Sequence, residues 1–385
     1  MTVYTEHQQG AHRARWLATV DEAYAEMERR IDAATQSVRL ETYLLREEGP
    51  AAVLWAALLR ARQRGVEVRM LLDAFGTEGV RAEFHAPLRE AGAHIIVFNP
   101  QRWMRRSFRN HRKLLACDGE HAVLGGFNIG PEYAGDGVTK GWCDTALYVG
   151  GPIVAQLEAS FDAMSRLAPF TLHAMHRFRW AAHHALAAAA KAPGPMQLLI
   201  AGPGTRGRLL RYRLGRDLKV ARDLAIASAY FLPSRGLRRL LYKAARRGTV
   251  RLLLAGQSDV PLARLAAEGY YGRMLKRRIE IHEYQPQILH AKLVLADDVA
   301  YVGSANLDRR SLHINYELLL RIDWPELVAD ARDWFGKALE SAQKLEPSAL
   351  RARRGLWRRT LSLLGYYLFA RLDLLVARRG FRTIS

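Results

Sequence analysis

Apolar and polar residues follow one another in blocks that predict alternating helices and strands along the start of the chain. Residues 19–37 carry apolar side chains at helical spacing, which indicates an amphipathic helix. Strands are expected at 37–45, 66–75 and 93–100, and a second helix at 50–64. Strands that alternate with helices predict an α/β fold built in layers.

The second half of the chain repeats this order of elements. A strand is expected at 220–230, a helix at 236–247 and another strand at 249–256. The stretch ARQRGVEVRMLLDAFG, residues 61–76, also matches AARRGTVRLLLAGQS, residues 244–258. This repeat is too long for a solenoid, so it predicts two related halves packed face to face.

An alanine-rich stretch at 171–195 separates the two halves and ends in Pro-Gly-Pro, which indicates a linker. It contains four histidines, but no carboxylate or cysteine joins them, so a solvated face is favoured over a metal site. These histidines are His173, His176, His183 and His184. We divide the chain into a first lobe at 1–170, a linker at 171–195, a second lobe at 196–346 and a tail at 347–385.

Length and composition add limits to this interpretation. A chain of 385 residues, 49% hydrophobic and 25% charged, can form two domains or one large duplicated domain. Two cysteines, Cys117 and Cys143, cannot build a disulfide framework, so a reducing compartment is expected. The first residues lack the apolar core of a signal peptide, and no apolar run is long enough for a simple membrane-spanning helix.

The net charge says more about the partner of this protein than the composition does. A formal charge of +20 predicts a partner rich in phosphate. Nucleic acid and anionic membrane are the two common partners of this kind, and charge alone does not choose between them.

One motif occurs twice and carries the candidate chemistry. In HRKLLACDGEHAVLGGFN, residues 111–128, the side chains of His111 and Lys113 lie two apart and face the same side of a strand. Asp118 and Gly119 form a turn, and the returning strand brings Asn128 back near His111. The stretch HAKLVLADDVAYVGSAN repeats the pattern with His290, Lys292, Asp297, Ser304 and Asn306.

Two such copies that face each other suit the transfer of a phosphoryl group. Lysines and amides stabilise the charge that phosphate oxygens gain in the transition state. One neutral histidine can attack phosphorus, while a second, protonated histidine gives its proton to the leaving alcohol. The two imidazoles must therefore start in different protonation states, which requires different environments.

Four carboxylates accompany the motif. Asp144 and Glu317, each expected on a strand soon after its motif, could orient a histidine and fix its tautomer. Asp118 and Asp297 lie an odd number of residues from the histidines, so they face away from the phosphate and act as structural supports.

These residues resemble the paired H-x-K-x4-D motifs of the phospholipase D superfamily. The first copy fits H-x-K-x4-D-x6-G-G-x-N, and the second has five residues between Asp297 and Gly303, as if one turn residue were missing. Asp298 could then share the role of Asp297. Further segments, such as LETYLLREEG, FRNHRKLL and GSANLDRRSLHINYE, resemble bacterial cardiolipin synthases.

The resemblance implies a fold and a division of labour. It implies two pseudo-symmetric lobes, each a mostly parallel mixed sheet flanked by helices, with the active site between them and no metal or other cofactor. It also implies that His111 is the nucleophile and His290 the general acid and base. Asn128, Ser304 and Asn306 would contact the phosphate.

The tail favours a membrane over nucleic acid. Residues 347–385 hold nine arginines and one acid, Asp373, around the apolar run TLSLLGYYLFA. This composition is typical of a helix that lies in a membrane interface rich in anionic lipid, although an ordinary packed C-terminal helix is the alternative.

The sequence therefore predicts a phosphatidyltransferase that acts on phosphatidylglycerol or another phospholipid, peripherally bound to the cytoplasmic face of the cell membrane. Phospholipase D hydrolysis is the nearest alternative, because it is the same reaction with water as acceptor. A nuclease is less favoured, because no nucleic-acid module is recognised. A binding protein with dead sites is disfavoured because both histidines are present.

Overall fold

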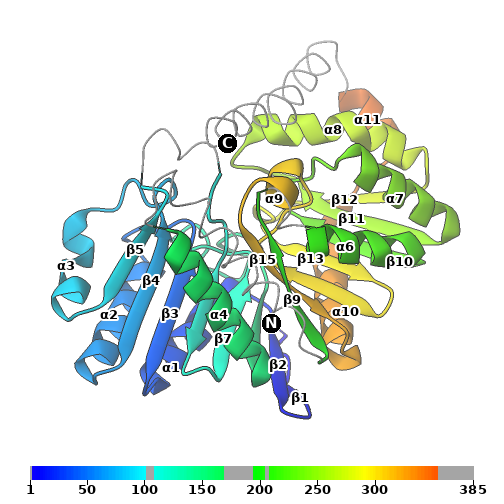
Figure 1. Ribbon diagram of the computed structural model, residues 1–385. Coiled ribbons are helices and arrows are strands. Elements are labelled where there is room, and N and C mark those ends of the chain that lie inside the picture. Colours follow the sequence, from blue (N-terminus) through cyan, green and yellow to red (C-terminus); the bar gives the residue numbers. More distant parts are fainter. Residues whose placement is uncertain (1, 101–107, 169–193, 204–207, 354–385) are drawn as a thin grey trace.

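Two lobes of similar architecture make up the protein, as the computed structural model shows (Figure 1). The structure describes residues 2–100, 108–168, 194–203 and 208–353. Lobe 1 contains β1 (His7–Gln9), β2 (His12–Leu17), α1 (Val20–Ala33), β3 (Ser37–Thr42), α2 (Pro50–Gln63), β4 (Glu67–Asp73), α3 (Ala82–Glu90), β5 (His94–Phe98), β6 (Leu114–Cys117), β7 (His121–Gly125), β8 (Ala146–Gly150) and α4 (Pro152–Leu167).

Lobe 2 repeats this plan after the linker. It contains β9 (Met196–Ala201), α6 (Arg208–Val220), β10 (Asp223–Ser228), α7 (Arg235–Arg247), β11 (Thr249–Ala255), α8 (Pro261–Leu275), β12 (Glu280–Tyr284), β13 (Lys292–Ala296), β14 (Val299–Gly303), α9 (Arg309–His313), β15 (Glu317–Ile322), α10 (Pro325–Glu340), β16 (Ala342–Lys344) and α11 (Pro347–Arg353). The helices and strands predicted from the apolar pattern are confirmed as α1, α2, α7, β3, β4, β5, β10 and β11.

Each lobe contains one eight-stranded sheet, and the two sheets share the order of seven strands, while β1 and β16 lie at opposite edges of this shared order. The orders are β1-β2-β8-β7-β6-β3-β4-β5 in lobe 1 and β16-β12-β11-β10-β13-β14-β15-β9 in lobe 2. When the second is read backwards, β2 corresponds to β9, β3 to β10, β4 to β11 and β6 to β13. The predicted pseudo-symmetric α/β fold is therefore confirmed.

The prediction of mostly parallel strands was wrong in detail. Among the described strands, parallel pairing occurs at β3–β4–β5 and at β10–β11–β12, and the other neighbours pair antiparallel. The parallel pairs have the long crossovers that they need, supplied by α2, α3, α7 and α8, whereas the motif hairpins β6–β7 and β13–β14 have short turns that permit only antiparallel pairing.

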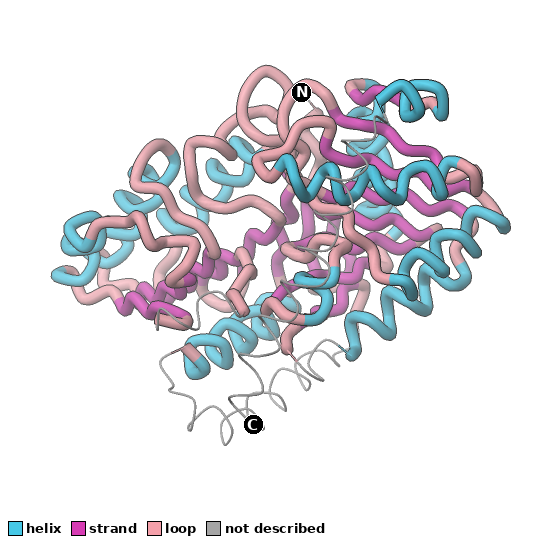
Figure 2. The backbone as a smooth tube through the Cα atoms, turned by 90° about the horizontal axis from the view of Figure 1, so that it is seen from above, coloured by secondary structure: helices cyan, strands magenta, loops and turns pink. Residues whose placement is uncertain are grey.

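The sheets lie between layers of helices (Figure 2). On the outer face of lobe 1, α1 and α2 cover the sheet, and on the outer face of lobe 2, α6, α7 and α8 do so. Between the sheets, α4 and α10 join one apolar core that draws residues from both lobes, including Phe161 and Phe335. The lobes are therefore fixed to each other by a shared core.

The two motif hairpins differ at their turns as the spacing predicted. The β6–β7 turn spans three residues from Asp118, and the β13–β14 turn consists of Asp297 and Asp298. Both Asp118 and Asp297 adopt the left-handed backbone conformation, with φ of 56° and 47°. The missing residue therefore leaves the position of Asp297 unchanged, and Asp298 is exposed.

The ends of the predicted domains fall partly outside the described residues. This applies to residues 169–193, which include most of the predicted linker 171–195 and its four histidines, and to tail residues 354–385. The first part of the predicted tail forms α11, which packs on lobe 2 through buried Leu350 and an ion pair of 2.6 Å between Arg353 and Glu283. Within the described part of the chain, no helix combines the length and apolar character needed to cross a membrane.

Candidate active site

Backbone bridges between the lobes bring the two motifs to one place. The His111 N–H donates to the Tyr316 carbonyl at 2.9 Å, next to Glu317. In the same way, the His290 N–H donates to the Cys143 carbonyl at 2.7 Å, next to Asp144. Each histidine is thus held beside a segment of the opposite lobe.

Each carboxylate that was predicted to orient a histidine contacts the histidine of the opposite lobe. His111 Nδ1 lies 3.0 Å from Glu317 Oε2, and His290 Nδ1 lies 2.7 Å from Asp144 Oδ2. The expectation that both carboxylates lie on strands was wrong for Asp144, which sits in the loop just before β8, whereas Glu317 begins β15. Neither half of the chain can therefore build an oriented histidine alone.

Each of the two lysines lies directly beside a histidine. Lys113 Nζ donates to the His111 carbonyl at 2.7 Å, and Lys292 Nζ lies 2.8 Å from His290 Nδ1. Burial, followed by the charges of Lys113 and Lys292, lowers the pKa of His111 well below its ordinary value. Burial and the charge of Lys292 lower the pKa of His290 to about 3. Because both lysines act on both histidines, the four groups form one site suited to an anion.

The two carboxylates differ in their preferred charge. Burial raises the pKa of Glu317 to about 8, which favours the neutral acid at neutral pH. Burial also opposes ionisation of Asp144, but the charges and hydrogen bond of Lys292 and His290 outweigh it and lower its pKa. The two imidazoles therefore meet different electrostatic partners, as the predicted two-step chemistry requires.

Aromatic rings cover the histidines, and the sequence reasoning did not assign them a role. The Tyr43 ring centroid lies 5.0 Å from that of His111, while Tyr133 and Trp142 lie 5.1 and 5.3 Å from His290. Their positions in the sequence could have pointed to them, because Tyr43 lies within the predicted strand 37–45, directly after the residues that form β3, and Trp142 is two residues from the candidate Asp144. These rings exclude water from the imidazoles, and His111 and His290 side chains are 14% and 5% exposed.

The predicted phosphate contacts make internal hydrogen bonds. Asn128 accepts from the Leu44 N–H at 3.2 Å and donates to the Tyr133 hydroxyl at 2.7 Å. Ser304 Oγ donates to Glu317 Oε2 at 2.5 Å, and Asn306 accepts from the Tyr230 N–H at 3.3 Å. These side chains support the site, and their contact with phosphate stays a prediction.

Asp118 and Asp297 occupy matching structural positions away from the histidines. Asp118 accepts from the N–H groups of Thr35, Gln36 and Ser37 at 2.8 to 2.9 Å. Asp297 accepts from the N–H groups of Arg222 and Asp223 at 3.0 and 2.8 Å. Each carboxylate thus ties its hairpin turn to the start of the neighbouring strand, β3 or β10.

We expect Asp118→Ala to lower the free energy of unfolding by about 2 kcal/mol, because three backbone donors lose a charged acceptor. Burial opposes ionisation of Asp118, but the bonds from Ser37, Thr35 and Gln36 outweigh it and lower its pKa. This contribution is present above the ordinary pKa of aspartate and is lost as the pH falls through the folded-state pKa. Urea unfolding measures it, with exposed Asp298→Ala as the control. An equal loss in both variants would contradict the role.

Comparisons with known proteins agree with this architecture. The family model described as "Cardiolipin synthase, PLD-like domain" matches residues 27–164 and 216–339. Cardiolipin synthase B of Salmonella typhi is 31% identical over 371 residues, which cover 94% of this chain and 88% of that protein. Cardiolipin synthase 1 of Bacillus cereus is 29% identical over 347 residues, which cover 88% and 68%.

Solved structures show the same fold. The phosphatidylserine synthase of Haemophilus influenzae Rd KW20 superposes with a TM-score of 0.74 at 14% identity and covers 97% of this chain and 96% of its own. The family model spans both motifs and both orienting carboxylates. The chain therefore belongs to the cardiolipin synthase family of phospholipase D-like proteins and is an enzyme of the phospholipase D superfamily.

Proposed function

We propose that this enzyme is a phosphatidyltransferase of the cardiolipin synthase type. It would move a phosphatidyl group from phosphatidylglycerol, or another phospholipid, to the hydroxyl of an acceptor through a phosphohistidine. The observation that carries the proposal is the pair of cross-lobe histidine–carboxylate contacts at one site that also holds both lysines. Membership of the cardiolipin synthase family supports the choice of substrate class.

In the first step, His111 Nε2 attacks phosphorus and the bond to the leaving alcohol breaks. Glu317 Oε2 accepts a hydrogen bond from Ser304 and can accept a second one from the Nδ1–H group of His111. With the proton on Nδ1, the lone pair on Nε2 is free to attack. His290 gives its proton to the departing oxygen, and the two lysines stabilise the charge on the phosphoryl oxygens.

In the second step, the acceptor hydroxyl attacks the phosphohistidine. His290 takes the proton of that hydroxyl, the new P–O bond forms and the P–N bond to His111 breaks, which restores both side chains. No redox or metal step is needed for this balance. A water molecule in place of the acceptor would give phosphatidic acid instead.

The carboxylates support His111 as nucleophile and His290 as acid and base. An ionised Asp144 stabilises the imidazolium form of His290, whereas a neutral Glu317 gives His111 no such stabilisation. A phosphodiester bound between the lysines brings negative charge that offsets Lys292, so protonation of His290 would accompany substrate binding.

An acceptor competition tests the proposal. Purified protein receives phosphatidylglycerol vesicles with and without added glycerol, and the lipid products are identified by mass. Cardiolipin supports the transferase, and glycerol should reduce it by competing as acceptor. Phosphatidic acid alone would move the assignment to a phospholipase D. No lipid turnover, with cleavage of single-stranded DNA in a parallel reaction, would move it to a nuclease.

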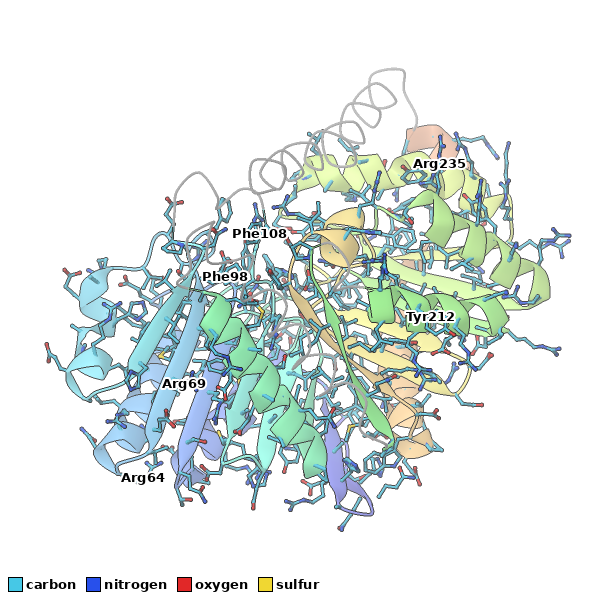
Figure 3. The ribbon with its side chains drawn as sticks, in the orientation of Figure 1. Arg64, Arg69, Phe98, Phe108, Tyr212 and Arg235 are labelled. Carbon is cyan, nitrogen blue, oxygen red and sulfur yellow. The ribbon has the colours of Figure 1, made fainter. Side chains whose placement is uncertain are left out.

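A basic groove on lobe 2 supports an anionic membrane surface as partner. The groove lies between α7 and the end of α8 and is lined by Arg239, Tyr242, Lys243, Ala245, Arg246, Lys276, Arg277 and Arg278. Helix α7 begins at Arg235, labelled in Figure 3, and carries no acidic residue. This face could bind lipid phosphates together with the tail. The membrane role of the tail and the cellular location of the protein stay predictions.

We expect Lys243→Ala with Arg246→Ala to weaken binding to phosphatidylglycerol vesicles roughly 30-fold, at about 1 kcal/mol for each cation near an anionic surface. Arg64→Ala with Arg89→Ala removes the same charge from lobe 1 and serves as the control. Sedimentation with vesicles measures both. Equal losses in the two variants would mean that binding follows net charge and not this groove.

A further inference from the structure

A cluster of polar side chains is buried behind His111. Glu41 lies on β3, Asp73 ends β4, and Asn110 and Arg112 flank the histidine; all four are at most 1% exposed. Asn110 Nδ2 donates to Glu41 Oε1 at 2.7 Å, and the Asn110 N–H donates to Asp73 Oδ2 at 2.7 Å. Arg112 forms an ion pair of 3.1 Å with Glu41. The residues on both sides of His111 are thus tied to the parallel strands.

The matching positions of lobe 2 are all apolar. The strand registers equate Glu41 with Ala227 and Asp73 with Ala255, since each sheet pairs these strands in the same way. The motif itself equates Asn110 with Leu289 and Arg112 with Ala291. The backbone is therefore duplicated, but the polar cluster is confined to the side of His111.

Such a cluster is costly for stability, which argues for a purpose. Burial raises the pKa of Glu41, lowers the pKa of Arg112 and raises the pKa of Asp73 to about 6. Within the part of the chain that the structure describes, Arg112 Nε and Nη1 have no hydrogen-bond partner. Because lobe 2 packs the same backbone with alanine and leucine, an apolar solution was available.

We propose that Glu41, Asp73, Asn110 and Arg112, which we call the buried polar cluster, position His111 as the nucleophile. The inference rests on the proposed function. A nucleophile must keep its Nε2 aligned with phosphorus through two displacements, and a small misplacement costs roughly 100-fold in rate. His290, between Leu289 and Ala291, lacks this anchoring and passes a proton between two different oxygens.

The test replaces members of the buried polar cluster with the residue types found at the matching positions of lobe 2. In Glu41→Ala with Arg112→Ala, we expect kcat for phosphatidylglycerol turnover to fall roughly 100-fold with KM nearly unchanged. The phosphohistidine found at His111 after acid quench should form correspondingly more slowly. Asn110→Leu removes the side-chain hydrogen bond from Asn110 to Glu41 by a single substitution, and it should also lower kcat with KM nearly unchanged. This variant keeps the test valid if the double variant does not fold.

Glu26→Ala with Arg30→Ala is the matched control, because it removes another buried ion pair of lobe 1, 2.7 Å long, in α1. Wild-type kcat in the folded lobe 2-like variants would overturn the inference. An equal fall of kcat in the control would also overturn it, since the effect would then be general destabilisation. Failure of the wild type to turn over lipid would instead refute the proposed function, and labelling of His111 by a soluble phosphodiester would still test the cluster.

Discussion

Replacement of His111 by alanine lowers lipid turnover by at least about 10⁴-fold, because the covalent route loses its nucleophile. His290→Ala behaves differently with a soluble diester whose leaving group needs no proton. In that variant, phosphohistidine should accumulate at His111, since the base that activates the acceptor is missing. Acid quench and mass spectrometry of labelled peptides measure both results.

The fold should survive both changes, since the His111 and His290 side chains contribute to the site and not to the main cores. Circular dichroism during thermal unfolding provides the control. Label on His290 in the His111→Ala protein would reverse the two roles. Turnover within about tenfold of the wild type would refute a covalent mechanism at His111.

The two orienting carboxylates should respond in opposite ways to neutral isosteres. Asp144→Asn removes the negative charge that stabilises protonated His290, so we expect kcat to fall roughly 10²- to 10³-fold. Glu317→Gln should change kcat less than about fivefold below pH 8, because burial raises the pKa of Glu317 to about 8 and the wild-type side chain is already neutral there. The variants should therefore differ by more than tenfold near neutral pH.

Above pH 8, the wild-type Glu317 ionises and the Gln variant does not, so their pH–rate profiles should separate on the alkaline side. The raised pKa of Glu317 also makes the stability of the fold depend on pH. The folded state binds this proton more tightly than the unfolded chain, so stability falls as the pH rises from about 4.5 towards 8. The Gln variant should lack this loss. Equal effects of the two substitutions at neutral pH would contradict the difference in charge between the carboxylates.

The duplicated fold and the motif residues could be predicted from the sequence because they are local patterns. Apolar periodicity specified strands such as β4 and β11, and the spacing of His111 and Lys113 is a property of one short segment. The missing turn residue before Gly303 was also visible as a change of spacing.

Other features depend on contacts between residues far apart in the chain. The pairing of His111 with Glu317 and of His290 with Asp144 arises where the lobes meet, so sequence order did not reveal it. The central antiparallel pairs, β3–β6 and β10–β13, form where a motif hairpin packs beside a strand from much earlier in the chain. Rings such as Trp142 became site residues because their loop crosses to the other lobe.

Two related α/β halves, each with a histidine and a lysine suited to phosphate, could be inferred from the residues alone. The difference between the two histidines, in contrast, arises from the packing of the folded chain. The exchanged carboxylates and the buried polar cluster place different charges around two nearly identical motifs. The physical reason is that protonation depends on burial and on neighbouring charge, and both are set by packing across the lobes.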